Sequence, residues 1–318
     1  MHGHLSEGRR WLEKLLERSE AGSARARAKA LRGAGALALT QGDYKRSEPL
    51  LEESLRLYRQ LGEKADIARQ LNYLAIAAQE QGKYDRAIAL QAEGVALNTE
   101  VGNRHGLASS LNNLGAALQS RGEYGRAKEL LEESVALETE LGDIRGLAAA
   151  LHNLGNGARL QGDDGRAREL LEDGLSRYRE VGDKRGIAKS YTSLAYLARA
   201  RGVRERTVTL CSESLDLLQQ VGDLVSMIEP LELLALVAGD DGNVGQAVRI
   251  VAAAEALRET IGASTAYRDV DQHERMLTTA RSRLGPAAWQ DAMQEGRAMT
   301  PEQAIAYTLR EVTSKGAT

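Results

Sequence analysis

The chain has 318 residues, a formal net charge of −3 at pH 7 and a single cysteine, and hydrophobic residues make up 42% of it. This charge provides no basic field to hold a nucleic-acid backbone, the lone cysteine excludes an internal disulfide framework, and no stretch of 18 apolar residues is available to span a membrane. We therefore expect a cytoplasmic protein with no membrane segment and no direct contact with nucleic acid.

Residues 1–22 have the pattern of one amphipathic helix, and they begin as if in the middle of a longer repeating unit. Gly3, Trp11, Leu12 and Leu16 align with Gly42, Leu50, Leu51 and Leu55 further along the chain. We predict a truncated repeat or an N-terminal capping helix, with Trp11 packed on the first complete repeat. A start in mid-unit is what we expect of a domain cut from a longer protein.

Residues 23–262 repeat with a period of 40 residues. Glycine recurs in two columns, at Gly42, Gly82, Gly122, Gly162, Gly202 and Gly242, and at Gly62, Gly102, Gly142, Gly182, Gly222 and Gly262. Glycine just after a helix allows the left-handed conformation that ends it. Each repeat is therefore predicted to be two helices and two turns, for example a first helix from Asp143 to Leu160 and a second from Asp163 to Val181.

Large and small apolar residues alternate within each repeat in a way that favours close helix packing. In the first helices, leucine pairs precede a small residue: Leu71 and Leu74 before Ala75, Leu111 and Leu114 before Gly115, Leu151 and Leu154 before Gly155. The second helices place Leu51, Leu131 and Leu171 in one column, and Cys211 falls in the same column. A buried, unreactive thiol is the expected role of that cysteine.

A stretch of the third repeat resembles the tetratricopeptide motif residue type by residue type. The matching residues are Leu111, Leu114, Gly115, Leu118, Gly122, Tyr124, Ala127, Leu131 and Ser134. The unit is longer than the family's usual one, as in the long-helix members found in polarity scaffolds, kinesin light chains and bacterial quorum-peptide receptors, which bind peptides. The resemblance implies an all-α, right-handed α-solenoid of about six repeats of 40 residues.

The tail, residues 263–318, is predicted to be a C-terminal helical cap that covers the open end of the array. Thr300, Pro301 and Gln303 provide the capping residue, the first helical position and the capping-box partner of its last helix. From Asn243 onward the chain resembles the C-terminal end of large bacterial transcription regulators of the LuxR type. The residues that carry this resemblance are Ala253, Ala254, Glu255, Ala256, Leu257, Arg258, Glu259, His273, Glu274, Arg275, Leu284, Gly285, Glu295, Gly296, Arg297 and Ala298. In that group an NTPase module, and often a helix-turn-helix DNA-binding domain, is joined to such an array.

Catalytic and cofactor motifs are absent from the sequence. No phosphate loop, dinucleotide fingerprint, zinc-ligand spacing or nucleophile elbow occurs, and the five histidines lie far apart in sequence. We expect no enzyme activity, no cofactor and no metal site. The repeated Arg46, Arg86, Arg126, Arg166 and Arg206 are interpreted as a solvated row with modest ion pairs.

In the tetratricopeptide family the first helices line the binding groove, and the family's spacing identifies the groove positions. The candidate peptide-binding residues are Arg69, Asn72, Tyr73, Asn112, Asn113, His152, Asn153, Asn156, Arg159, Lys189 and Tyr196. A carboxamide both donates to and accepts from a peptide backbone, so a row of asparagines fits an extended ligand. The alternative is that these asparagines bridge adjacent first helices or face solvent.

The same face is predicted to be basic along most of its length and acidic at one end. The basic residues are Lys29, Arg32, Arg69, Arg159, Lys189 and Arg199, and the acidic ones are Glu229, Glu232 and Asp240. This pattern favours a protein or peptide partner that is acidic or carries a carboxylate. A sensing arm of a regulator, a free-standing assembly scaffold and, less favoured, a nucleic-acid-binding repeat remain open, as does the oligomeric state.

Overall fold

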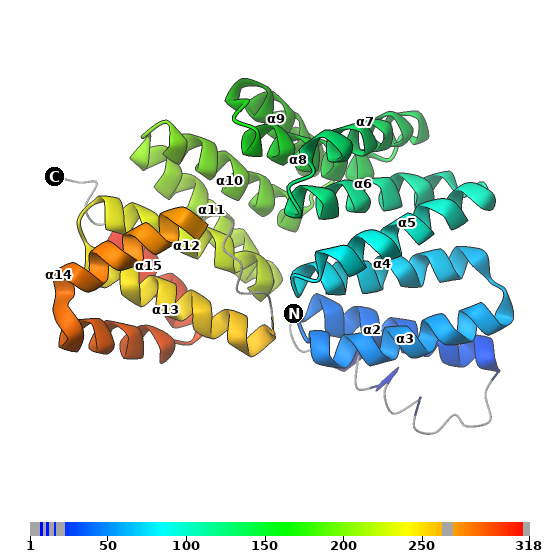
Figure 1. Cartoon of the computed structure of the whole chain (residues 1–318), viewed down its shortest axis with the longest axis horizontal. Coiled ribbons are helices and arrows are strands. Elements are labelled where there is room, and N and C mark those ends of the chain that lie inside the picture. The colour runs from blue at the N-terminus through cyan, green and yellow to red at the C-terminus, as the bar shows by residue number, and fades with distance from the viewer. Residues whose placement is uncertain (1–6, 9–10, 13–15, 17–22, 263–269, 314–318) are drawn as a thin grey trace. The chain divides into compact units, whose positions relative to one another are not determined.

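The computed structural model describes residues 7–8, 11–12, 16, 23–262 and 270–313, and this part of the chain is helical (Figure 1). The helices are α2 (Ala24–Thr40), α3 (Tyr44–Leu61), α4 (Lys64–Glu80), α5 (Tyr84–Glu100), α6 (Arg104–Ser120), α7 (Tyr124–Leu141), α8 (Ile144–Leu160), α9 (Asp164–Glu180), α10 (Lys184–Ala200), α11 (Arg204–Val221), α12 (Leu224–Asp240), α13 (Val244–Ile261), α14 (Val270–Arg297) and α15 (Pro301–Thr313). None of these helices is long and apolar enough to cross a membrane.

The chain divides into two compact units, Met1–Asp183 and Lys184–Thr318. In the first unit, helices α2 to α9 pair in chain order as four hairpins, and each hairpin packs on the next. In the second unit, α10 pairs with α11 and α12 with α13, and α14 and α15 pack on α13 and α12. The all-α fold of consecutive helical hairpins is thus confirmed, whereas the domain boundaries at 22 and 262 stay predictions.

The turns follow the glycine columns. All twelve repeated glycines have positive φ, between 66° and 84°. The N-caps are also where the sequence predicts them: Asp143 accepts a hydrogen bond from Gly146 N at 2.9 Å, and Asp163 accepts one from Arg166 N at 3.0 Å. Helices α8 and α9 therefore begin and end within one residue of their predicted bounds.

The two helices of a hairpin cross at the small residue of the first helix. A Cβ added at Gly115 would lie 2.7 Å from Leu131 Cγ, a separation that atoms do not adopt. Leu131 is fully buried there, so its side chain fills the space that glycine leaves. Leu51 makes the same close contact with Gly35, and Leu171 makes it with Gly155. Cys211, in the same column, is fully buried, and burial raises its pKa.

Buried serines add a hydrogen bond between the helices of alternate hairpins. Ser54, Ser134 and Ser214 donate through Oγ to the carbonyls of Ala28, Ala108 and Ala188, at 2.8, 2.9 and 2.9 Å. Each hydroxyl is fully buried, and its bond removes the cost of an unpaired polar group.

The described residues near the N-terminus contradict one prediction. Trp11 is 67% exposed, so it does not pack on the first complete repeat. Leu16 takes that role, since it packs against the apolar cluster that contains Leu55 and Tyr58. Residues 17–22, which belong to the predicted capping segment, lie outside the described part of the chain.

The C-terminal end of the second unit is covered as predicted. Thr300 and Gln303 form the reciprocal capping box, with Thr300 N donating to Gln303 Oε1 at 2.9 Å and Gln303 N donating to Thr300 Oγ1 at 3.2 Å. Helix α14 bends at Gly285, where φ is 73°, and its Ala280 and Ala292 are buried against Val248 of α13. Residues 263–269 of the predicted cap are outside the described range.

An ion pair lies inside the second unit. Glu232 of α12 and Arg258 of α13 are hydrogen bonded, and both are almost completely buried, at 1% and 5% exposure. Glu232 is therefore a core residue, and its assignment to the acidic end of an open face is wrong. The sequence places it two residues after Pro230, on a helix that is apolar on most sides.

We predict that Gly142→Ala destabilises the protein by about 1–2 kcal/mol, because alanine is strained in the left-handed conformation. The control is Gly125→Ala, since a Cβ meets nothing within 4 Å at either site but Gly125 is helical. There alanine should be neutral or stabilising by up to about 1 kcal/mol. Thermal unfolding followed by circular dichroism checks both, and equal effects would contradict the assignment of the turn.

We also predict that Arg258→Met destabilises the Lys184–Thr318 unit by about 3–5 kcal/mol, because it leaves the buried Glu232 without a partner. Arg249→Met is the control, since its partner Glu295 is exposed, and it should cost less than about 1 kcal/mol. Urea unfolding followed by tryptophan fluorescence measures the effect, because Trp289 is in this unit and the other tryptophan, Trp11, is already exposed. Similar losses in both variants would contradict the burial of the pair.

Candidate functional site

The first helices of successive hairpins contact one another in the first unit. Helix α4 contacts α6, and α6 contacts α8. The predicted groove positions of these helices consequently share one face, which we call the carboxamide face. Its residues are Asn72 and Tyr73 of α4, Asn112 and Asn113 of α6, and Asn153 of α8, and all five are half-buried.

A chain of side-chain hydrogen bonds runs along the carboxamide face. Asn153 Nδ2 donates to Asn112 Oδ1 at 2.9 Å, Asn112 Nδ2 donates to Asn113 Oδ1 at 3.2 Å, and Asn113 Nδ2 donates to Asn72 Oδ1 at 2.7 Å. Every bond points the same way, from α8 towards α4. The asparagines therefore do bridge adjacent first helices, which is the alternative that the sequence leaves open.

Two glutamines that the sequence analysis missed complete this chain. Gln91 Nε2 of α5 donates to Asn72 Oδ1 at 2.9 Å, and Gln119 Nε2 of α6 donates to the Asn153 carbonyl at 2.9 Å. Both glutamines are buried, at 1% and 9% exposure. A signal for Gln91 existed, because it is a polar residue in the column of Leu51 and Leu131.

The bridging leaves hydrogen-bonding groups for a ligand. Each carboxamide has two N–H donors and an oxygen with two lone pairs. Asn72 Oδ1 already accepts two bonds, from Gln91 and Asn113, whereas within the described residues no bond is recorded to Asn153 Oδ1 or from the Asn72 amide. The chain thus has unused donors at one end and an unused acceptor at the other, on side chains that are half exposed.

Other predicted site residues are more enclosed. His152 and Asn156 of α8 are buried, and their Nε2 and Nδ2 atoms lie 2.9 Å apart. Tyr196 of α10, in the second unit, is 6% exposed. Arg159 is half-buried and Lys189 is exposed. The structure therefore joins the four asparagines of the carboxamide face by hydrogen bonds. It packs Tyr73 against the apolar cluster that contains Leu71, and it puts three of the predicted residues largely inside their units.

The predicted basic character of this face is reduced by ion pairs. Arg32 and Arg69 share Asp66, at 2.6 and 3.0 Å. In the second unit, Arg199 pairs with Asp240 at 2.7 Å. Because each pair places opposite charges in contact, the field that would select an acidic ligand is weaker than the sequence indicates.

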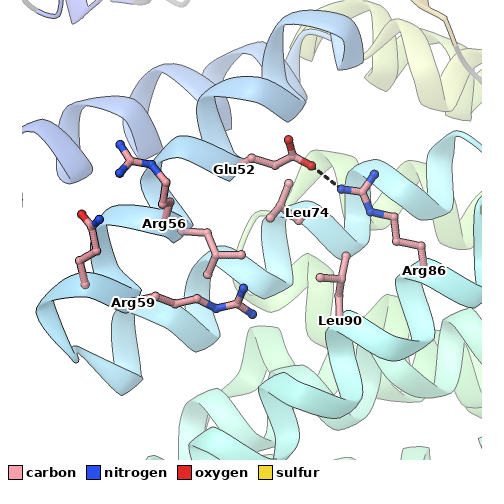
Figure 2. Close-up of a pocket in the computed structure, with 8 residues that line it drawn as sticks. Glu52, Arg56, Arg59, Leu74, Arg86 and Leu90 are labelled. Carbon is pink, nitrogen blue, oxygen red and sulfur yellow. Dashed lines mark hydrogen bonds and ion pairs between the residues drawn. The ribbon is translucent and has the colours of Figure 1, made fainter.

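A cavity lies between α3, α4 and α5, and the asparagines of the carboxamide face are not among the residues that line it (Figure 2). It has a volume of about 640 Å³, and Leu74 and Leu90 are among the apolar residues that line it. Two of its arginines are paired, since Arg86 pairs with Glu48 and Glu52, and Arg59 pairs with Glu93 at 2.7 Å. Arg86 belongs to the predicted row of second-helix arginines, and two other members are also paired, Arg126 with Glu123 at 2.7 Å and Arg166 with Glu169 at 3.1 Å. These three residues agree with the prediction of a solvated row with modest ion pairs.

Comparison with solved structures identifies similar folds. The apo form of RapI is 16% identical, with a TM-score of 0.60, and the match covers 84% of this chain and 88% of that one. A Rap protein complexed with competence and sporulation factor is 12% identical, with a TM-score of 0.67 and coverage of 95% and 78%. The Rap conjugation gene regulator of plasmid pLS20, in complex with the Phr* peptide, is 15% identical, with a TM-score of 0.58 and coverage of 93% and 71%.

At these identities the likeness concerns the fold. No curated protein matches the chain in sequence. Family models described as tetratricopeptide repeat match residues 66–140, and residues 27–61 and 147–181. These matches cover the hairpins whose glycine turns and helix crossings are described above. Residues 27–61, 66–140 and 147–181 therefore match tetratricopeptide repeats, and the consecutive helical hairpins have the fold of the TPR-like solenoids named above.

Proposed function

We propose that this protein is a protein- or peptide-binding module and that its ligand is an extended segment lying along the carboxamide face of the first unit. The observation that carries the proposal is the one-way chain of asparagines with unused groups at both ends. An extended peptide presents alternating carbonyls and amides, so it meets such a chain whatever its side chains are.

The similar structures support a peptide as the ligand. One is a Rap protein complexed with competence and sporulation factor, and another is a Rap gene regulator in complex with the Phr* peptide. Half-burial of the asparagines adds to this support, because it lowers the local dielectric and makes each hydrogen bond to a ligand stronger than in open water.

Within this function, we favour the sensing arm of a cytoplasmic transcription regulator or signalling ATPase. The motivation is the resemblance of the chain from Asn243 onward to the ends of such regulators. A free-standing assembly scaffold is the alternative, and it would bind partners without a linked NTPase or DNA-binding activity. Binding of nucleic acid is less favoured because Arg32, Arg69 and Arg199 are already paired with carboxylates.

An acidic preference of the ligand is the finer part of the proposal. Lys29, one of the basic residues predicted for this face, is exposed on α2 of the first unit. Because exposed charges act mainly on the rate of encounter and are screened by salt, the preference should fade as ionic strength rises. Hydrogen bonds from asparagine do not share that dependence.

The test is capture from a library of peptides, compared between the wild type and an Asn112→Ala, Asn153→Ala double variant. We expect the double variant to lose affinity for captured peptides at least about tenfold, since each lost hydrogen bond contributes about 0.5–1.5 kcal/mol. A Glu132→Ala, Glu133→Ala variant is the control, because both glutamates are exposed on α7, away from the asparagines. Circular dichroism should show the same helicity in all three proteins.

Unchanged affinities in the double variant would contradict the assignment of the binding face. The same peptides should be measured in acidic and basic versions at low and high salt. Equal affinities for both versions at low salt would contradict the acidic preference while leaving the binding face intact.

A further inference from the structure

A polar cluster lies at the junction between the third and fourth hairpins of the described array, where α7 ends and α8 begins. His105 of α6, Glu138 of α7 and Asp143 at the N-cap of α8 each place a possible ligand atom within 4.8 Å of the others. The three residues come from three helical elements that all belong to the first unit. None of the three residues takes part in the hydrogen bonds of the carboxamide face.

Glu138 is the unusual member of this cluster. Its side chain is only 4% exposed, and Oε2 has no hydrogen-bond partner among the described residues. Burial, with a smaller contribution from Asp143, raises the pKa of its carboxyl to about 7. A buried carboxylate without a cation or donor costs free energy, so its presence calls for a partner.

The fold makes room for this carboxyl. A Cβ added at Gly146 would lie 2.4 Å from Glu138 Cδ and Oε1, so only glycine at that position lets the carboxyl lie over the first turn of α8. Asp143 accepts from Gly146 N through one oxygen, at 2.9 Å, and its other oxygen stays available. Glu138 and Asp143 also line a cavity of about 310 Å³, which has space for water.

The preceding repeat shows how the same position is satisfied without an ion. There Asn98 replaces Glu138, Asn103 replaces Asp143 and Ser110 replaces Ala150. Asn98 Nδ2 donates to Ser110 Oγ at 3.1 Å, and Asn103 Nδ2 donates to Asn98 Oδ1 at 2.8 Å. In the repeat with Glu138, Ala150 replaces the Ser110 hydroxyl and Asp143 replaces the Asn103 amide, so neither position offers Glu138 a hydrogen-bond donor.

Other repeats replace His105 with arginine and form a plain ion pair. Arg145 pairs with Asp183 at 2.6 Å, and Arg185 pairs with Asp223 at 2.7 Å. Those repeats have Tyr178 and Leu218 at the position of Glu138. Only the repeat with Glu138 therefore combines an imidazole with two carboxylates among the described hairpins.

We propose that His105, Glu138 and Asp143 bind one divalent transition-metal ion of the zinc class, with water in the remaining position. Imidazole nitrogen and carboxylate oxygen bind zinc at about 2.0–2.2 Å, and three protein ligands plus water are a common arrangement. In the proposed site the exposed His105 ring moves slightly inwards, so that its nitrogen and the carboxylate oxygens, which lie within 4.8 Å of one another, all reach the same ion. The ion joins α6, α7 and α8, and thereby fixes one hairpin on the next.

The test uses Zn²⁺ itself, in the full chain carrying His2→Ala and His4→Ala so that terminal histidines do not bind it. Isothermal titration should give one ion per chain, and Zn²⁺ should raise the melting temperature. His105→Arg recreates the ion pair of the neighbouring repeats, and Glu138→Gln keeps the shape of the side chain, so both variants should fold. Each should weaken Zn²⁺ binding at least about tenfold, because even residues that only orient a ligand have effects of that size.

Asp173→Asn is the matched control, because Asp173 lines the same cavity but is outside the cluster, and it should bind as the wild type does. Co²⁺ provides a second readout, since its visible absorption reports the ligand set and should be lost in His105→Arg. The proposal is wrong if the wild type shows no stoichiometric Zn²⁺ binding, or if His105→Arg and Glu138→Gln bind as tightly as the wild type.

Discussion

The close crossing of the two helices in each hairpin determines what the rest of the array can do. Leu131 occupies the space that a side chain at Gly115 would need, and the same exchange occurs between Gly155 and Leu171. This contact sets the distance between the helices, and the left-handed glycines set the direction of each turn. Both recur with the period of the sequence, so successive first helices present the same positions to one another.

The asparagine chain depends on that regularity. Its bonds between helices join residues 41 positions apart, Asn153 with Asn112 and Asn113 with Asn72, and the step from Asn112 to Asn113 links the two. A change in the stacking of one hairpin would break a bond on both sides of it. In the proposed function, a bound peptide replaces one of these hydrogen bonds between first helices. The packing of neighbouring hairpins then changes, and ligand binding is thereby coupled to the conformation of the array.

Local features of the fold could be predicted from the sequence, because they depend on residues close together in the chain. The glycine turns, the caps at Asp143 and Thr300 and the burial of Cys211 are of this kind. Side-chain partners between repeats could not, since they depend on how far one hairpin is rotated against the next. The pairing of Arg32 with Asp66 belongs to this second class. The burial of Glu232 against Arg258 was also missed, because it depends on how α12 packs on α13.

In the candidate site, too, the positions of residues could be predicted from the sequence, whereas their side-chain partners could not. Family spacing was enough to identify the asparagines, but not to show that they bond to each other or that Gln91 joins them from a second helix. The cluster at Glu138 was also missed, because His105 and Glu138 are far apart in sequence and neither belongs to a recognised metal motif. A residue that breaks its own repeat column, as Gln91 and Glu138 do, is the signal that would have revealed them.

The central claim is that ligands lie along the carboxamide face of the first unit. Site-specific photo-crosslinking tests it most directly, with a benzophenone side chain placed either at Ala116, on α6 at the position two residues after Leu114, or at Glu133 on the exposed side of α7. The account predicts that bound peptides are labelled from position 116 and not from position 133. Labelling from position 133 alone, or equally from both, would contradict it.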